Sequence, residues 1–112
     1  MVKKYTPKRG DIIWINFDPT VGHEQKGRRP AIIVSHDEYN KKTGLSIACP
    51  ITSKTKQYAY EVQLTGENVS GFILTDQVRN IDWETRKAEF IERVSSSVLD
   101  EIEAKLLTLI RE

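Results

Sequence analysis

The sequence has a single cysteine, and it lacks both a long apolar run and a cluster of acidic residues. Because Cys49 has no second thiol to pair with, no internal disulfide can form, and one thiol cannot build a zinc site. No stretch is long and apolar enough to cross a bilayer, and Lys3 and Lys4 lead into a polar segment rather than the core of a signal peptide. We therefore expect a cytoplasmic protein without membrane contact, in which Cys49 is a buried core residue.

Repeats, linkers and low-complexity segments are also missing from the 112 residues. This length is close to the commonest domain size, so we expect residues 1–112 to form a single domain. Metal-assisted hydrolysis would need several carboxylates at suitable spacing, and Asp76 and Asp82 have no such partners in sequence. We expect neither a bound metal nor another cofactor.

Charge is nearly balanced overall but unevenly distributed. The whole chain carries +1, whereas residues 1–60 hold eleven Lys or Arg and five Asp or Glu, a surplus of +6. A basic half can attract a polyanion such as RNA even when the whole protein is near neutral. Taken alone, this asymmetry is more typical of an ordinary solvated surface, and it favours RNA only together with the loop residues described below.

Short apolar segments separated by turn residues predict a mostly β protein. Simple alternation places Trp14 in the core and puts Phe90 and Glu92 on one face of the last strand. One helical turn is expected at 37–42, ended by Gly44. The expected strands cover residues 11–17, 30–35, 45–52, 58–64, 72–75, 78–81 and 87–94, with 72–75 and 78–81 as two short strands or one interrupted strand.

Only the C-terminal segment has a clear helical pattern. Ser97 and Asp100 have the spacing of a capping box, although Asp stands where Glu or Gln is preferred. One apolar stripe is formed by Leu99, Ile102, Leu106 and Ile110. Many short strands with one helix favour a small barrel or strongly bent antiparallel sheet carrying a C-terminal helix.

The most informative stretch of the chain lies between Asn16 and Ser35. A turn at Asp18-Pro19 and glycines at positions 22 and 27 predict a loop between two apolar strands. Polar groups on such a loop are placed to meet a ligand rather than to pack. This segment combines acid, base and phosphate-binding side chains: His23, Glu24, Gln25, Lys26, Arg28 and Arg29.

Several ordered blocks of the sequence follow the pattern of one known family. They are Gly10-Asp11, Phe17-Asp18-Pro19, Gly22-His23-Glu24-Gln25, Gly27, Arg29-Pro30, Pro50-Ile51-Thr52, Gly71, Asp76-Gln77-Val78-Arg79 and Ile81-Asp82. With these blocks the chain resembles the MazF/PemK family of toxin endoribonucleases over almost its whole length. The resemblance implies an SH3-like barrel that forms a homodimer and is silenced by a cognate antitoxin. It also implies a type II toxin that cuts single-stranded mRNA sequence-selectively, without a metal or the ribosome.

Arg29 and Thr52 are the first candidates for catalysis. Metal-free cleavage needs an in-line 2′-hydroxyl, a base, an acid and positive charge on the phosphorane, and it yields a cyclic phosphate and a 5′-hydroxyl. Arg29 suits the phosphate, because its guanidinium makes two parallel bonds and Pro30 restricts its backbone. Thr52 ends a predicted strand, where its hydroxyl could bond a phosphate oxygen or only its own backbone. The resemblance implies catalytic roles for both residues.

His23 and Glu24 are further catalytic candidates. Histidine can serve as acid or base near neutral pH, and Glu24 could accept a proton or pair with a neighbouring arginine. One branch of the family, the Kid/PemK toxins, uses a histidine here with a later arginine and aspartate. This chain keeps His23 and Asp76 but has Leu74 at the matching arginine position. A catalytic role and a contact or solvated-loop role for His23 therefore both stay open.

Other residues are expected to contact RNA rather than to catalyse. Gln25 suits base-edge recognition, and the basic and aromatic residues that follow Thr52 could extend a track for the backbone and stacked bases. Trp83 is expected to be exposed, where it could stack or bind a partner. The expected contacts are Gln25, Lys26, Arg28, Ser53, Lys54, Lys56, Tyr58, Asp76 and Gln77.

Two other functions stay open from sequence alone. A toxin with the same barrel could poison DNA gyrase without being an enzyme, like CcdB, although the GHEQ and RP blocks disfavour that reading. A domain of this kind could also bind RNA after losing activity. In the favoured interpretation, surplus apolar residues predict a symmetric homodimer. Single-stranded RNA and an acidic, partly disordered C-terminal tail of the antitoxin then compete for its basic groove.

Overall fold

A curled antiparallel sheet and two helices make up the computed structural model, which describes residues 5–16 and 28–111. Within these residues, no helix is both long and apolar enough to span a membrane. The strands are β1 (Asp11–Asn16), β2 (Arg28–Ile33), β3 (Leu45–Thr52), β4 (Glu61–Thr65), β5 (Ser70–Leu74), β6 (Arg79–Asp82) and β7 (Glu89–Arg93). The helices are α1 (Asp37–Thr43) and α2 (Ser96–Ile110), and the 3-10 turn η3 (Thr75–Gln77) separates β5 from β6.

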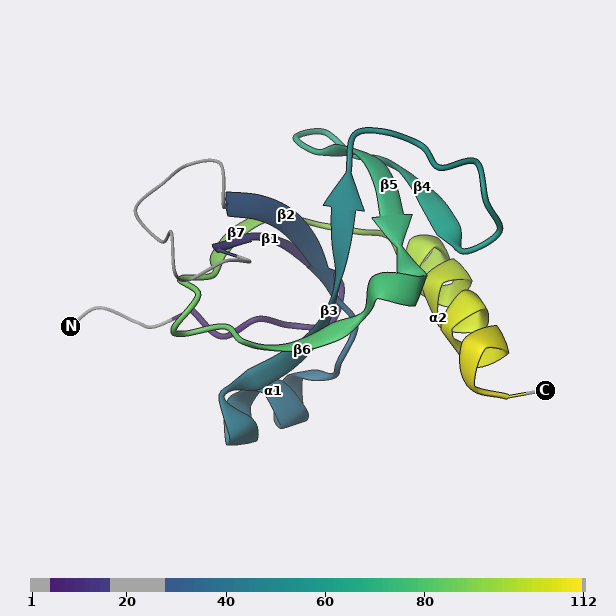
Figure 1. Cartoon of the computed structure of the whole chain (residues 1–112). Coiled ribbons are helices and arrows are strands. Elements are labelled where there is room, and N and C mark those ends of the chain that lie inside the picture. Colours follow the sequence, from purple (N-terminus) through teal and green to yellow (C-terminus); the bar gives the residue numbers. More distant parts are fainter. Residues whose placement is uncertain (1–4, 17–27, 112) are drawn as a thin grey trace.

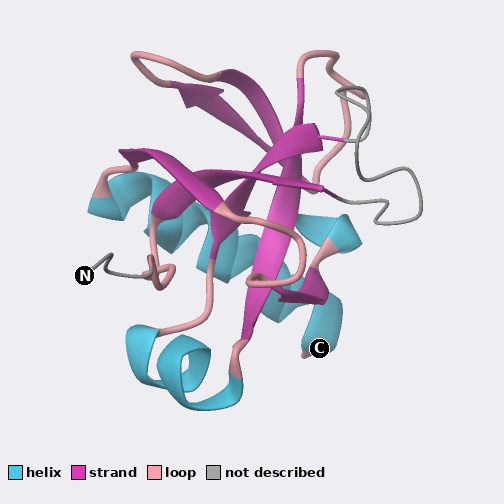
Figure 2. Ribbon diagram, turned by 90° about the vertical axis from the view of Figure 1, so that its left-hand side faces the viewer, coloured by secondary structure: helices cyan, strands magenta, loops and turns pink. Residues whose placement is uncertain are grey.

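Strand β3 is the centre of the sheet. The strand order is β4-β5-β3-β2-β1-β7, and β6 also pairs with β3. The first half of β3 pairs with β6, whereas Ile51 and Thr52 at its end pair with β5. Because one strand serves three neighbours, the sheet bends strongly into a half-barrel, with α2 lying outside it beside β4 (Figure 1). The second view shows α2 running behind the strands (Figure 2). The predicted mostly β fold with a bent sheet and a C-terminal helix is confirmed.

Two apolar cores lie on opposite faces of β1. Ile12 belongs to a cluster that α2 closes with Ile102, whereas Ile13 and Ile15 belong to a second cluster on the other side of the sheet. The prediction that β1 is buried on both faces is therefore confirmed for these isoleucines. Cys49 is fully buried in the first cluster, and this burial raises its thiol pKa to about 12, as befits a core residue rather than a nucleophile.

The expectations for the two tryptophans were both wrong. Trp14 is 38% exposed, because it lies opposite Pro30 at the surface rather than in either core. Trp83 is 8% exposed, and its indole N–H donates a 3.2 Å hydrogen bond to the carbonyl of Asn40 in α1. Helix α1 thus provides the buried partner that this indole needs.

Both predicted helices are present, and only the N-terminus of α2 differs from the prediction. Helix α1 ends at Gly44, whose left-handed φ of +72° closes the helix as its N–H bonds to Asn40. Helix α2 begins at Ser96 after Ser95, which caps no backbone N–H with its side chain, so the predicted capping box at Ser97 is wrong. The hydroxyls of Ser95 and Ser97 instead lie 2.9 Å apart and bond to each other.

Strand β7 contains an irregularity that its sequence pattern hides. Glu92 lies opposite Ile12, but Phe90 lies opposite Ile13, so Ile91 is an extra residue in β7. A bulge of this kind re-aims the side chains on either side of it. Glu92 therefore lies on the Ile12 face and Phe90 on the Ile13 face, which corrects the expectation that both share one face.

Candidate active site

Arg29 and Thr52 line one surface pocket of about 310 Å³. Arg29 comes from β2 and Thr52 from the end of β3, so the fold joins two side chains that are distant in sequence. Ser53, an expected RNA contact, lines the same pocket. The remaining lining residues are Trp14, Pro30, Ile51, Asn68, Val69 and Ser70.

The position of Arg29 follows from the pairing of β1 with β2. Arg29 lies opposite Ile15, and Pro30 after it keeps the backbone extended. Its side chain is exposed, and among the described residues no hydrogen bond or ion pair engages its guanidinium. Such a group can direct two parallel N–H donors at a phosphate.

Thr52 is positioned by the junction of β3 and β5. It lies opposite Phe72, and its half-buried hydroxyl accepts a 3.3 Å hydrogen bond from the backbone N–H of Lys54. Because the hydroxyl is the acceptor there, its own proton remains available for donation to a ligand oxygen. The backbone-capping alternative is thus present in the structure, and it is compatible with a role towards a phosphate.

Among the polar and aromatic residues of the pocket, three were not expected from sequence to be there: Trp14, Asn68 and Ser70. The signal for Trp14 is the hairpin register, since its partner Pro30 directly follows Arg29. An exposed indole beside the arginine that is predicted to bind phosphate suits the stacking of a base. No local pattern marks Asn68, which reaches the pocket through the turn between β4 and β5.

A second group of expected contacts gathers outside this pocket. Tyr58 donates a hydrogen bond from its hydroxyl to the Asp76 carboxylate, and the Lys56 ammonium lies 5.8 Å from the centroid of the Tyr58 ring. Burial and the bond to Asp76 raise the pKa of Tyr58 to about 12, so the phenol stays neutral. Lys54 is exposed on the same loop, and Gln77 is exposed in η3.

Arg28 lies apart from the pocket. Its guanidinium forms an ion pair with Glu89 on β7 and contacts the carbonyl of Lys87, so the side chain is engaged within the protein. Leu74, at the position where the Kid/PemK branch has an arginine, is buried in the sheet. The remaining candidates lie outside the described residues: His23, Glu24, Gln25 and Lys26.

Across residues 5–16 and 28–111, no three His, Cys, Asp or Glu side chains are grouped so that they could hold a metal ion. Asp82 is instead tied to its own turn, where the backbone N–H of Thr85 lowers its pKa.

Comparison with known families decides how this site is classified. Residues 8–110 match the family described as PemK-like, MazF-like toxin of type II toxin-antitoxin system. The chain belongs to this family. The predicted resemblance to MazF/PemK toxins is thereby confirmed, and the pocket belongs to a PemK/MazF-type toxin.

Two relatives and one solved structure illustrate the similarity to other PemK/MazF toxins. The chain is 44% identical to the endoribonuclease toxin MazF of Escherichia coli K12, over 98% of this chain and 99% of that protein. It is 34% identical to the endoribonuclease PemK of Escherichia coli, over 96% of this chain and 85% of that protein. A crystal structure of MazF from Deinococcus radiodurans superimposes with a TM-score of 0.85 at 45% identity, covering 96% of this chain and 98% of that one.

Proposed function

We propose that this MazF-like toxin endoribonuclease cleaves single-stranded RNA in the Arg29/Thr52 pocket, without a metal ion. The observation that carries the proposal is the meeting of Arg29, Thr52 and Trp14 around one pocket. The guanidinium and the hydroxyl suit the phosphate of a nucleotide, and the exposed indole suits the stacking of its base.

The chemistry assigned to the pocket is attack of the 2′-hydroxyl on the adjacent phosphorus. The 2′-oxygen forms a bond to phosphorus as the 5′-oxygen leaves in line, giving a 2′,3′-cyclic phosphate and a 5′-hydroxyl. Arg29 binds two non-bridging oxygens and stabilises the charge that grows on them. The Thr52 hydroxyl donates to the same phosphate and restrains its orientation.

The proton transfers are assigned to residues of the connection between β1 and β2. Glu24 is the proposed base that takes the 2′-hydroxyl proton, and His23 is the proposed acid that protonates the leaving 5′-oxygen. Both assignments rest on the sequence and the family resemblance, since these residues lie outside the described part. The RNA strand then continues past Ser53 towards Lys54 and Lys56, which meet its phosphates.

The proposed partners are a cognate antitoxin and a second copy of the chain. A chain of a MazE–MazF crystal structure from Deinococcus radiodurans superimposes on this chain with a TM-score of 0.85 at 41% identity. We assign the antitoxin's acidic, partly disordered C-terminal tail to the basic surface that also attracts RNA. Exposed apolar side chains, which a homodimer would cover, remain at Ile47, Val78, Leu107, Leu109 and Ile110.

One experiment separates the possible functions. Purified protein is incubated with a long RNA of defined sequence in excess EDTA, alongside the Arg29→Ala variant and a gyrase supercoiling assay. Cleavage by the wild type and not by the variant supports the proposal. Binding without cleavage would show that the protein is an RNA-binding module. Gyrase inhibition without RNA binding would show that it is a gyrase poison.

A further inference from the structure

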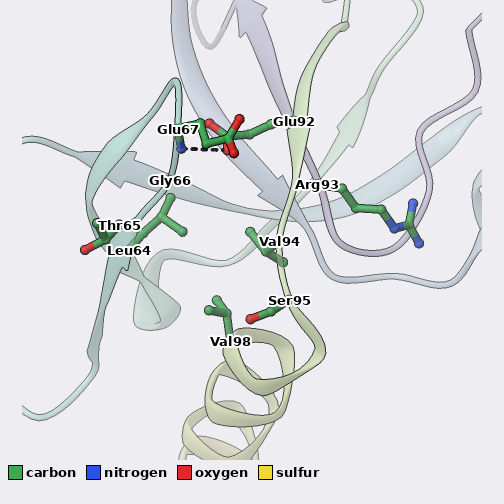
Figure 3. Close-up of a pocket in the computed structure, with 9 residues that line it drawn as sticks. All are labelled: Leu64, Thr65, Gly66, Glu67, Glu92, Arg93, Val94, Ser95 and Val98. Atoms are coloured by element: carbon green, nitrogen blue, oxygen red, sulfur yellow. Dashed lines mark hydrogen bonds between the residues drawn. The ribbon is translucent and has the colours of Figure 1, made fainter.

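The carboxylate of Glu92 accepts hydrogen bonds from three consecutive backbone N–H groups of the β4–β5 turn (residues 66–69). The N–H of Glu67 donates to Oε1 at 3.1 Å, and those of Asn68 and Val69 donate to Oε2 at 2.7 and 2.8 Å. Figure 3 shows Glu92 reaching this turn while its neighbour Arg93 points to the other side. Hydrogen bonds to an ionised acceptor are about twice as strong as neutral ones, so one side chain fixes the whole turn.

The turn is built to fit closely around this carboxylate. The N–H of Gly66 bonds to the carbonyl of Val69 at 3.0 Å and closes the turn. A Cβ on Gly66 would lie 2.6 Å from that carbonyl oxygen and 2.8 Å from Oε1 of Glu92. Only glycine therefore fits at this position without moving either group.

Glu92 lies on the face of the sheet that carries the first core cluster. It lies opposite Ile12, a member of the first core cluster, and the bulge at Ile91 turns it to that side. A half-buried carboxylate beside a core is costly unless hydrogen bonds replace its water. The three turn N–H groups supply that replacement.

The other side of the same turn faces the Arg29/Thr52 pocket. Asn68 and Val69 line that pocket, but Glu92 does not; it lines a separate pocket of about 400 Å³ with Gly66 and Glu67. The Asn68 side chain is exposed, and within the described chain its amide makes no hydrogen bond. An amide in this position can donate to and accept from the edge of a base.

We propose that Glu92 is a positioning residue for RNA recognition, holding the β4–β5 turn so that Asn68 reads a base beside the scissile phosphate. This inference rests on the proposed function of the Arg29/Thr52 pocket. Glu92 acts through the turn and touches neither the RNA nor the reacting atoms. Asn68 is the residue that contacts the base, and its substitution changes which RNA sequences are bound and cut.

The test compares Glu92→Ala, Glu92→Gln and Asn68→Ala with the wild type. Glu101→Gln is the matched control, because it removes the same charge from an exposed site on α2. Three quantities are measured: amide exchange of residues 67–69 in the free protein, the Kd for an uncleavable 2′-O-methyl RNA, and kcat and KM with cut-site mapping on a long RNA.

We expect Glu92→Ala to lose protection at the three amides. It should raise the Kd and KM about tenfold, the scale for losing one neutral hydrogen-bonding contact, here that of Asn68 with a base, with a smaller change in kcat. Glu92→Gln keeps one acceptor oxygen, which can accept from the N–H groups of Asn68 and Val69. Its amide protection, Kd and KM should therefore lie between those of the wild type and of Glu92→Ala. Asn68→Ala should weaken binding and relax cut-site choice without altering amide exchange. The double variant should add little to Glu92→Ala.

The outcomes distinguish this inference from the proposed function. Wild-type affinity and cut-site choice in both Glu92→Ala and Asn68→Ala would overturn the inference while leaving the function intact. A wild type that binds the RNA in a Glu92-dependent way but never cuts would overturn the function and support the inference. Removing a carboxylate should by itself strengthen binding to a polyanion. A loss of affinity in Glu101→Gln equal to that in Glu92→Ala would therefore also overturn the inference, because it would show that the loss does not depend on the β4–β5 turn.

Discussion

The backbones of Thr52 and Gly71 are in direct contact across β3 and β5. A Cβ added to Gly71 would lie 2.3 Å from the carbonyl oxygen of Thr52, closer than any real contact allows. The absence of a side chain at position 71 therefore lets β5 approach the end of β3, where the candidate catalytic hydroxyl sits.

We predict that Gly71→Ala destabilises the protein by more than about 2 kcal/mol, because its φ of +155° strains an L residue and the new methyl group also meets backbone that cannot rotate away. Gly44→Ala is the matched control: its φ is +72° and its Cβ would meet nothing within 4 Å, so only backbone strain of about 1–2 kcal/mol is expected. Urea unfolding measures both. A Gly71→Ala variant more stable than Gly44→Ala would refute the contact argument.

Arg29→Ala should abolish most cleavage and leave stability unchanged. Loss of one group that stabilises developing charge costs about two to three decades in rate. The guanidinium makes no hydrogen bond in the described part of the chain, so the melting temperature should stay within error. Arg29→Lys should recover part of the rate, because lysine keeps the charge but not the two-pronged geometry. Lys41→Ala, which removes an exposed charge from α1, is the control; a comparable loss there would point to general electrostatics.

Thr52→Ala should lower kcat/KM by about tenfold to a hundredfold, the range for one hydrogen bond to a charged group. Thr52→Ser keeps the hydroxyl and should stay close to wild type. Steady-state kinetics on a short single-stranded RNA measures the difference. Equal losses in both variants would assign Thr52 a packing role through its methyl group instead of a role through its hydroxyl.

Much of the fold is readable from local sequence. The run from Leu45 to Thr52 is bounded by Gly44 and by polar residues, and β3 has those limits. The positions of the tryptophans were not readable, because burial of Trp83 depends on α1, which is distant in sequence. The bulge at Ile91 also left no sequence signal, since no glycine marks it.

The residues of the candidate site were likewise predictable from sequence only in part. Arg29 and Thr52 were found from residue chemistry and from the family resemblance, and the structure places them around one pocket. Asn68 and Glu92 could not be found, because their roles arise from a turn whose N–H groups converge only after folding. Their functional roles and those of His23 and Glu24 stay predictions.

RNA and the antitoxin tail should exclude each other. Residues 1–60 have a surplus of +6, from eleven basic and five acidic residues, and the two proposed ligands, RNA and an acidic tail, are both polyanions. We predict that a 2′-O-methyl RNA displaces a labelled antitoxin tail, and that both affinities fall as salt rises. Fluorescence anisotropy at several salt concentrations measures this. A ternary complex with both ligands at full occupancy would contradict a shared surface.

The chemistry of the cut ends tests the central claim most directly. Long single-stranded RNA is digested in excess EDTA by the wild type and by Arg29→Ala, and the downstream fragments are offered to polynucleotide kinase without prior phosphatase treatment. Attack by the 2′-hydroxyl in the Arg29/Thr52 pocket predicts that wild-type fragments are labelled at once, because they carry a 5′-hydroxyl, and that the variant yields almost none. Fragments that require phosphatase before labelling, or cleavage that appears only with added magnesium, would contradict the account.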